Sequence, residues 1–249
     1  MSGRRLLLLS LGGTITMVPS AEGGIAPKLG AAELVASVPD LAKVATIEAD
    51  SPARLPSPSL TPGHLVDVAR RITAAFAAGV DGAVVIQGTD TIEESAFLLD
   101  RLVAGDKPVV VTGAMRGAAA PGAEGPANLL AAARVAASDA ARGLGTLAVL
   151  NDEIHAARFV KKSHTALPSA FTSPMAGPLG IVAEDRVRLF ARVDRHPVLP
   201  LQDGPPAPVA LLRWAMGDDG RMLGALAGLG YAGAVIEGMG AGHVPADAA

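Results

Sequence analysis

Three polar clusters in this 249-residue chain carry side chains that could together perform nucleophilic catalysis. Thr14 ends a Gly-Gly-Thr run, Thr89 and Asp90 lie in a Gly-Thr-Asp-Thr run, and Lys162 follows further along the chain. A threonine hydroxyl can attack an amide carbonyl when a nearby group takes its proton, and a desolvated lysine amine can serve as that base. These residue types therefore predict acyl-transfer chemistry if the fold brings them together.

Each cluster also has a purely structural interpretation, which the residues alone leave open. A Gly-Gly-Thr run can form a tight turn between a strand and a helix, with or without a bound anion. Thr89 and Asp90 are residue types that cap helix amino termini, and a lysine such as Lys162 is usually solvated at the surface.

The pattern of apolar residues predicts the elements that must position these clusters. Short apolar runs alternate with longer segments of helical period, which is typical of an α/β fold with a doubly wound, mostly parallel sheet. Thr14 and Thr89 would follow strands at their carboxyl ends, where open α/β sheets place their sites. The expected strands span residues 6–10, 45–48, 83–86, 109–112 and 147–150, and the expected helices span 31–37, 62–78, 92–104 and 127–141.

Composition divides the chain into three parts. Residues 1–190 would form a large amino-terminal domain, and the proline-rich residues 191–208 would form a linker. Residues 209–249 would form a smaller, partial α/β domain, with strands at 209–214 and 233–236 around a helix at 221–229. A half-built parallel sheet would expose an apolar edge and face, so the sequence indicates an apparently truncated second domain.

Taken together, these segments resemble the bacterial-type L-asparaginases, whose hallmarks are a Gly-Gly-Thr motif near the amino terminus and a later Gly-Thr-Asp-Thr motif. The likeness runs from about Leu6 to the end of the chain. It implies that residues 1–190 are the asparaginase catalytic domain. It further implies that Thr14 is the nucleophile and that Thr89, Asp90 and Lys162 are catalytic residues that pass a proton along.

The resemblance also implies a set of substrate contacts. Ser57 aligns with the serine that holds the substrate α-carboxylate. Thr89 and Asp90 would contact both the substrate and Lys162. Pro58 stands where relatives often carry a polar side chain that contacts the α-amino group, which weakens the expected amino-acid selectivity. Lys161 matches no lysine of the family and is expected to be structural.

Two departures from the family pattern bear on activity. Many relatives place a tyrosine on a mobile loop after the nucleophile, where this chain reads Glu-Gly-Gly-Ile at residues 22–25, and its one tyrosine is Tyr231. Glycines at 23 and 24 would still allow a flap to close over the substrate. The second departure is the missing carboxyl-terminal segment, which in the family sends an acidic residue into a neighbouring subunit's site. We therefore expect the site to be incomplete.

The activity implied by the resemblance is that of an amidohydrolase that converts L-asparagine to L-aspartate and ammonia through a threonine acyl-enzyme, with no metal or organic cofactor. Two alternatives stay open: a glutaminase-asparaginase of broader specificity, and a non-catalytic homologue that binds an amino acid. The family also implies a homo-oligomer, either a dimer or a homotetramer.

Composition and residue patterns indicate which classes of partner this chain binds. The net charge of -3, the single Trp and the single Tyr offer neither a basic surface nor a stacking platform for nucleic acid. The chain has no cysteine, and its histidines lack metal-ligand spacing. No segment reaches the ~20 apolar residues of a membrane span, and cleaving the apolar start as a signal peptide would remove Thr14. We therefore expect a small-molecule amino-acid substrate, no nucleic-acid or membrane partner, and a cytoplasmic location.

Overall fold

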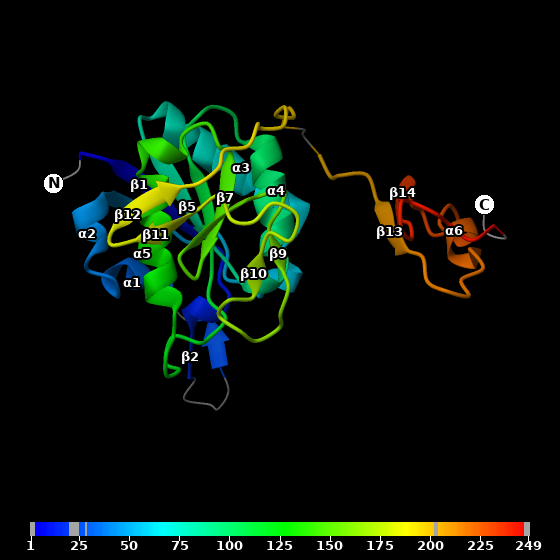
Figure 1. The fold of residues 1–249 in the computed structure, drawn as a ribbon, viewed down its shortest axis with the longest axis horizontal. Helices are drawn as coiled ribbons and strands as arrows, with labels where there is room; N and C mark the ends of the chain where they lie inside the picture. The colour runs from blue at the N-terminus through cyan, green and yellow to red at the C-terminus, as the bar shows by residue number, and fades with distance from the viewer. Residues whose placement is uncertain (1–2, 20–24, 28, 202–203, 247–249) are drawn as a thin grey trace. The chain divides into compact units, whose positions relative to one another are not determined.

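The computed structural model describes residues 3–19, 25–27, 29–201 and 204–246, and the chain forms two compact units (Figure 1). Unit 1 is Met1–Leu201 and unit 2 is Gln202–Ala249. Residues 191–201, which fall in the proline-rich segment, belong to unit 1. Within them, Arg195 donates hydrogen bonds to backbone carbonyls after the helix that ends at Leu102, and the backbone N–H of Leu199 donates to Arg101 at 2.7 Å.

Unit 1 is built on an eight-stranded sheet in the order β12-β11-β8-β7-β6-β5-β1-β4. Neighbouring strands from β4 to β7 pair in parallel, and β8, β11 and β12 add antiparallel pairs at one edge. The sheet is therefore mostly parallel, as the sequence predicts. Its strands are β1 (Arg5–Ser10), β4 (Thr46–Asp50), β5 (Gly82–Ile86), β6 (Val109–Thr112), β7 (Thr146–Leu150), β8 (Glu153–Ala156), β11 (Gly180–Ala183) and β12 (Arg186–Leu189).

Helices cover both faces of this sheet (Figure 1). One face packs against α1 (Ala31–Ala36), α2 (Leu41–Val44) and α5 (Gly125–Ala136), and the other against α3 (Pro62–Ala77) and α4 (Ile92–Leu102). Alternation along β1 sends Leu6 and Leu8 into the first core and Leu7 and Leu9 into the second. Since both faces are covered, the central strands are apolar at most positions, which is typical of the α/β class.

All the strands and helices expected before residue 150 form, with small shifts at their ends. The largest shift concerns the helix expected at 127–141, because α5 ends at Ala136 and a separate 3₁₀ turn follows at Asp139–Ala141. The structure also contains elements that the sequence did not predict, namely α2, the antiparallel strands β8, β11 and β12, and two short hairpins. The hairpins are β2 (Met17–Pro19) with β3 (Ile25–Pro27), and β9 (Lys161–Lys162) with β10 (Phe171–Thr172).

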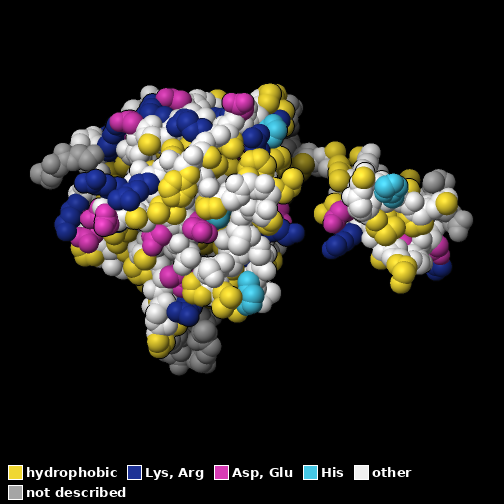
Figure 2. Space-filling view, viewed as in Figure 1, with side chains coloured by type: hydrophobic (Ala, Val, Ile, Leu, Met, Phe, Trp, Pro, Cys, Tyr) yellow, Lys and Arg dark blue, Asp and Glu magenta, His cyan; other side chains and the backbone are white. Residues whose placement is uncertain are grey.

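Unit 2 contains one parallel strand pair and one short helix. β13 (Val209–Arg213) pairs with β14 (Gly233–Glu237), and α6 (Arg221–Ala225) lies between them in the sequence. The helix expected at 221–229 stops at Ala225 and continues as turns. All five residues of β14 are exposed, and Val235 is 57% exposed. Figure 2 shows hydrophobic side chains on the visible surface of this unit.

Candidate active site

Loops that follow β1, β4 and β5 approach one another through their backbones. Gly12 lies so close to Leu55 that an added Cβ would be 2.6 Å from its carbonyl oxygen, and a Cβ on Gly13 would be 2.1 Å from the backbone nitrogen of Gly88. Both glycines have positive φ angles, 108° at Gly12 and 90° at Gly13, which glycine adopts without steric cost. The absence of side chains here brings Thr14 beside the turn that begins at Gly88.

Ser57 is joined to that turn by contacts on two sides. It is 2% exposed, and a Cβ on Gly88 would lie 2.7 Å from its Oγ. Its Oγ accepts a hydrogen bond from the backbone N–H of Asp90 at 3.2 Å. Its carbonyl oxygen accepts another from the hydroxyl of Thr91, also at 3.2 Å. Ser57 and the Asp90 turn therefore form one hydrogen-bonded unit.

Gln87 braces the same turn from inside the protein. This residue is fully buried at the end of β5, and its Nε2 donates to the hydroxyl of Thr91 at 3.1 Å and to the carbonyl of Gly88 at 3.3 Å. Because buried amide donors are costly to leave unpaired, these bonds favour one conformation of the turn. The sequence did not indicate a role for Gln87, because a single buried glutamine belongs to no recognisable sequence pattern.

Lys162 reaches the turn from the β9–β10 hairpin. Its Nζ donates to Thr89 Oγ1 at 2.9 Å and pairs with Asp90 Oδ1 at 2.5 Å. The lysine side chain is 14% exposed, whereas that of Asp90 is 62% exposed. The amine therefore lies between a hydroxyl and a carboxylate and is largely shielded from water.

This arrangement bears on the helix-capping interpretation of the Gly-Thr-Asp-Thr run. Thr89–Thr91 form a 3₁₀ turn before α4, and neither this turn nor α4 receives a side-chain cap at its start. The side chains of Thr89 and Asp90 contact Lys162 instead. The helix-capping interpretation is therefore wrong for both residues, and Lys162 is not a freely solvated surface charge.

One cavity of about 190 Å³ gathers all five predicted site residues. Hydroxyls, a carboxylate and an amine therefore face a single space large enough for a small ligand. The predicted residues that line it are Thr14, Ser57, Thr89, Asp90 and Lys162, and further wall residues include Met17, Pro58, Met115 and Thr165. Glu22, Gly23 and Gly24 of the expected flap lie outside the described residues.

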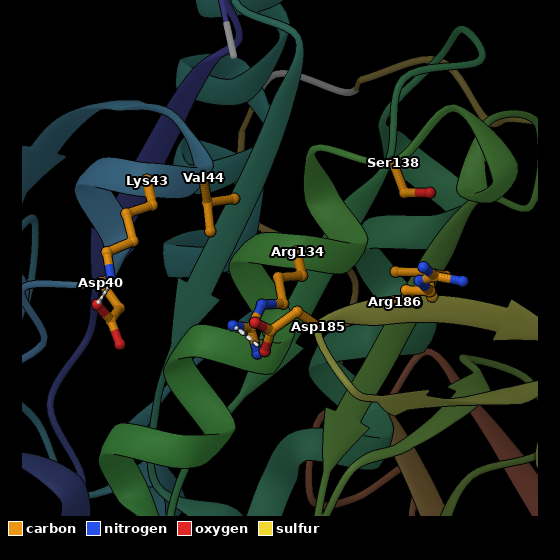
Figure 3. Close-up of a pocket in the computed structure, with 8 residues that line it drawn as sticks. Asp40, Lys43, Val44, Arg134, Ser138, Asp185 and Arg186 are labelled. Atoms are coloured by element: carbon orange, nitrogen blue, oxygen red, sulfur yellow. Dashed lines mark ion pairs between the residues drawn. The ribbon is translucent and has the colours of Figure 1, made fainter. Parts of the chain in front are cut away.

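A larger hollow of about 600 Å³ shares no lining residue with this cavity (Figure 3). Two of its three cationic side chains pair with carboxylates of the same hollow. Lys43 Nζ lies 2.7 Å from Asp40 Oδ1, and Arg134 Nη2 lies 2.6 Å from Asp185 Oδ1. Because none of the predicted site residues lines this hollow, the smaller cavity remains the candidate site.

Asn128 and Glu93 support the site without lining the cavity. Asn128 is buried in α5, donates from Nδ2 to the carbonyl of Gly113 at 2.9 Å, and accepts at Oδ1 from the backbone N–H of Asn151 at 2.8 Å. It thus ties two loops together. Glu93 accepts a hydrogen bond from the backbone N–H of Lys162 at 2.6 Å, a contact that the sequence analysis missed.

The part of the chain that the structure describes contains neither a group of metal-ligand side chains nor a membrane-crossing helix. Within it, no group of three or more His, Asp or Glu side chains is placed to hold a metal ion. No helix in the described ranges has the length and apolar character that crossing a bilayer requires.

Comparison with known proteins agrees with this geometry. Residues 5–195 match the family described as asparaginase, N-terminal. The L-asparaginase of Bacillus licheniformis is 34% identical over 243 residues, covering 97% of this chain and 75% of that protein. The glutaminase-asparaginase of Pseudomonas fluorescens biotype A is 38% identical over 190 residues, covering 74% of this chain and 52% of that protein.

A solved structure extends the likeness to the fold. The crystal structure of a probable cytoplasmic L-asparaginase from Campylobacter jejuni matches with a TM-score of 0.89 and 30% identity. That match covers 98% of this chain and 77% of the other. The chain thus spans from about half to about three quarters of the length of these relatives. From its motifs, its fold and these matches, the chain belongs to the asparaginase family.

Proposed function

We propose that this protein hydrolyses the side-chain amide of L-asparagine to L-aspartate and ammonia through a threonine acyl-enzyme. The observation that carries the proposal is the contact of Lys162 Nζ with Thr89 Oγ1 at 2.9 Å and Asp90 Oδ1 at 2.5 Å, in a cavity that Thr14 also lines. Relatives named L-asparaginase support the same activity.

The proposed reaction has two halves. In the first, the hydroxyl oxygen of Thr14 attacks the amide carbon, its proton passes to the leaving nitrogen, and ammonia departs from a β-aspartyl ester. In the second, water attacks the ester and restores the Thr14 hydroxyl, with the proton relayed through Thr89 to Lys162. Backbone N–H groups near Thr14 and Thr89 would stabilise the oxyanion, and such donors contribute about 3 kcal/mol each.

Substrate recognition is assigned to Ser57 and Asp90. The hydroxyl of Ser57 would hold the α-carboxylate, and the exposed carboxylate of Asp90 would pair with the α-amino group while it also contacts Lys162. The side chains named in the proposed route all lie within residues 1–190, so we assign the chemistry to that part of the chain.

A broader glutaminase-asparaginase activity is the second candidate. It is favoured by the 38% identity to the Pseudomonas fluorescens enzyme of that name. Glutamine is longer by one methylene, and a difference of that size contributes only about 1–3 kcal/mol to discrimination. Both amides therefore belong in the same assay.

The proposed cellular context follows the relatives. The Campylobacter jejuni protein is named cytoplasmic, and we assign this protein the same location. We also assign it a homo-oligomeric state, a dimer or a tetramer, which light scattering of the purified protein would test.

Ammonia release from L-asparagine and L-glutamine at neutral pH tests the activity. We expect release from L-asparagine, and we expect Thr14→Ala to reduce it at least 10³-fold because the nucleophile is lost. Thermal melting of both proteins controls for folding. A folded wild-type protein that releases no ammonia, but whose melting temperature rises with L-aspartate, would replace the enzyme with an amino-acid-binding protein.

A further inference from the structure

Lys162 lies on β9, one of the shortest strands of unit 1. β9 is two residues long, pairs only with the two-residue β10, and belongs to a separate sheet from the eight central strands. Val160, Ala170 and Phe171 anchor the hairpin in the core into which α4 also packs. Because two-stranded hairpins are only marginally stable in water by themselves, such contacts outside the hairpin help to keep the amine of Lys162 within hydrogen-bonding distance of Thr89.

Glu93 supplies that support from a rigid helix. Its Oε1 accepts a hydrogen bond from the backbone N–H of Lys162 at 2.6 Å, and bonds to an ionised acceptor are about twice as strong as neutral ones. Glu93 lies in the first turn of α4, and Ile92, Ala96 and Leu99 of the same helix are buried in the core. The carboxylate is thus carried by a helix that is itself fixed by packing in the core.

The segment that holds the backbone of Lys162 also holds its amine. Thr89 and Asp90 contact Nζ from the 3₁₀ turn that leads directly into α4, and Glu93 contacts the backbone N–H. Residues 89–93 therefore contact Lys162 both at its backbone N–H and at its side-chain amine. Motion of the hairpin away from α4 would break the bond to Glu93 and pull the amine from Thr89.

We propose that Glu93 is a positioning residue, whose carboxylate holds the backbone of Lys162 so that its amine stays between Thr89 and Asp90. This inference rests on the proposed function, because it assigns Glu93 a role in the same reaction. Glu93 does not line the cavity. Its loss should therefore act on the proton relay and leave substrate binding largely intact.

Kinetics of three variants test the positioning role. Glu93→Ala should lower kcat for ammonia release by about 10- to 100-fold, because displacements near 1 Å cost that much, and leave KM within about threefold. Glu93→Gln should recover most of kcat, since its amide oxygen can accept the same hydrogen bond. The adjacent Glu94 is exposed, and Glu94→Ala is the matched control, expected to keep wild-type kcat.

The reactivity of Lys162 gives a second readout that needs no activity. In the wild-type protein an amine-acylating reagent should modify the shielded Lys162 more slowly than the exposed Lys161, as measured by peptide mass spectrometry. Glu93→Ala should raise the ratio of Lys162 to Lys161 modification several-fold, and Glu94→Ala should leave it unchanged. If Glu93→Ala does not fold, Glu93→Asp takes its place, because it retains the charge on a shorter side chain. We expect its modification ratio to lie between the wild-type ratio and the raised ratio expected for Glu93→Ala.

The outcomes separate this inference from the proposed function. If wild-type protein releases no ammonia but the modification ratio rises in Glu93→Ala, then the activity fails and the positioning contact stands. If wild-type protein is active and folded Glu93→Ala keeps both its kcat and its modification ratio, then the positioning role is overturned. A parallel loss in Glu93→Gln and Glu94→Ala would also overturn it, because the effect would then follow surface charge.

Discussion

Gly13 is the residue at which the site tolerates the least change. Its φ of 90° and ψ of -179° lie in a backbone region used almost only by glycine, and a Cβ would lie 2.1 Å from the backbone nitrogen of Gly88. Backbone atoms cannot move aside as the end of a side chain can. Replacing Gly13 therefore forces the Thr14 loop away from the Gly88 turn.

Gly13→Ala should lower the free energy of unfolding by more than about 4 kcal/mol, because it combines a clash with backbone strain. Gly105→Ala is the matched control. Gly105 has a similar φ of 93° but nothing within 4 Å of an added Cβ, so we expect a loss of only about 1 kcal/mol. Urea unfolding of both variants measures the difference, and equal losses would show that φ alone decides the cost.

At the residue scale, the sequence predicted the candidate catalytic residues better than the residues that position them. Thr14, Thr89 and Lys162 stand out because their types and motif context indicate chemistry. Glu93 and Gln87 act through one or two hydrogen bonds each, and nothing in their local sequence distinguishes them from a solvated glutamate or a packed glutamine. Only the three-dimensional approach of β9 to α4 makes Glu93 significant.

At the scale of elements, the antiparallel strand β8, which lies between β11 and β7, contains a buried histidine close to the end of the hairpin that carries Lys162. His155 is 0% exposed, and its Nδ1 lies 2.9 Å from the Oγ of Ser173, just after β10. Burial lowers the pKa of His155 from its usual 6.5 to about 4. Glu153 lies 3.4 Å from Nε2, but desolvation dominates, so the ring is neutral at pH 7.

This depressed pKa predicts acid sensitivity in a defined window. The unfolded chain takes up the proton near pH 6.5 and the folded chain only near pH 4, so the free energy of unfolding falls as pH drops between these values, by up to about 3 kcal/mol. His155→Asn should flatten that dependence, whereas the exposed His196→Asn should not. Urea unfolding at pH 7, 6 and 5 measures it, and an unchanged slope in His155→Asn would contradict the assignment.

The same scale shows which elements the sequence could predict. The central strands are runs of apolar residues and the helices carry an apolar face, so both appear in the pattern of residues. β9 and β10 span two residues each, too few for any periodicity, and β11 and β12 span only four residues each, which is short for a strand pattern. The turn before β8 uses Asn151 and Asp152 at φ of 51° and 60°, a hairpin geometry that this dipeptide permits but does not require.

At the scale of the whole molecule, the two units differ in how much apolar surface they bury. The two core clusters draw their members from residues 6–201, whereas β13 and β14 keep Leu211 and Val235 largely exposed. The stability of unit 1 therefore comes from its own packing. The sequence predicted this exposure, because a half-built parallel sheet leaves an apolar edge and face uncovered.

Residues 1–201 produced alone should keep the main thermal transition of the full chain, because both cores are retained. Circular dichroism melting of the two proteins measures this, at matched concentration and pH. A melting temperature more than about 5 °C lower, which corresponds to roughly 1–2 kcal/mol or more in a domain of this size, would show that unit 2 stabilises unit 1.

The backbone contacts at Gly12, Gly13 and Gly88 also set what natural variation or protein engineering can change in this site. Where two main chains touch, there is no side chain to exchange, so that wall of the cavity is closed to mutation. The remaining wall contains Pro58, Met115 and Thr165, which project from separate loops and are independent of those contacts. New substrate preferences should therefore arise by substitution at these three positions, leaving the glycine framework and the reacting groups intact.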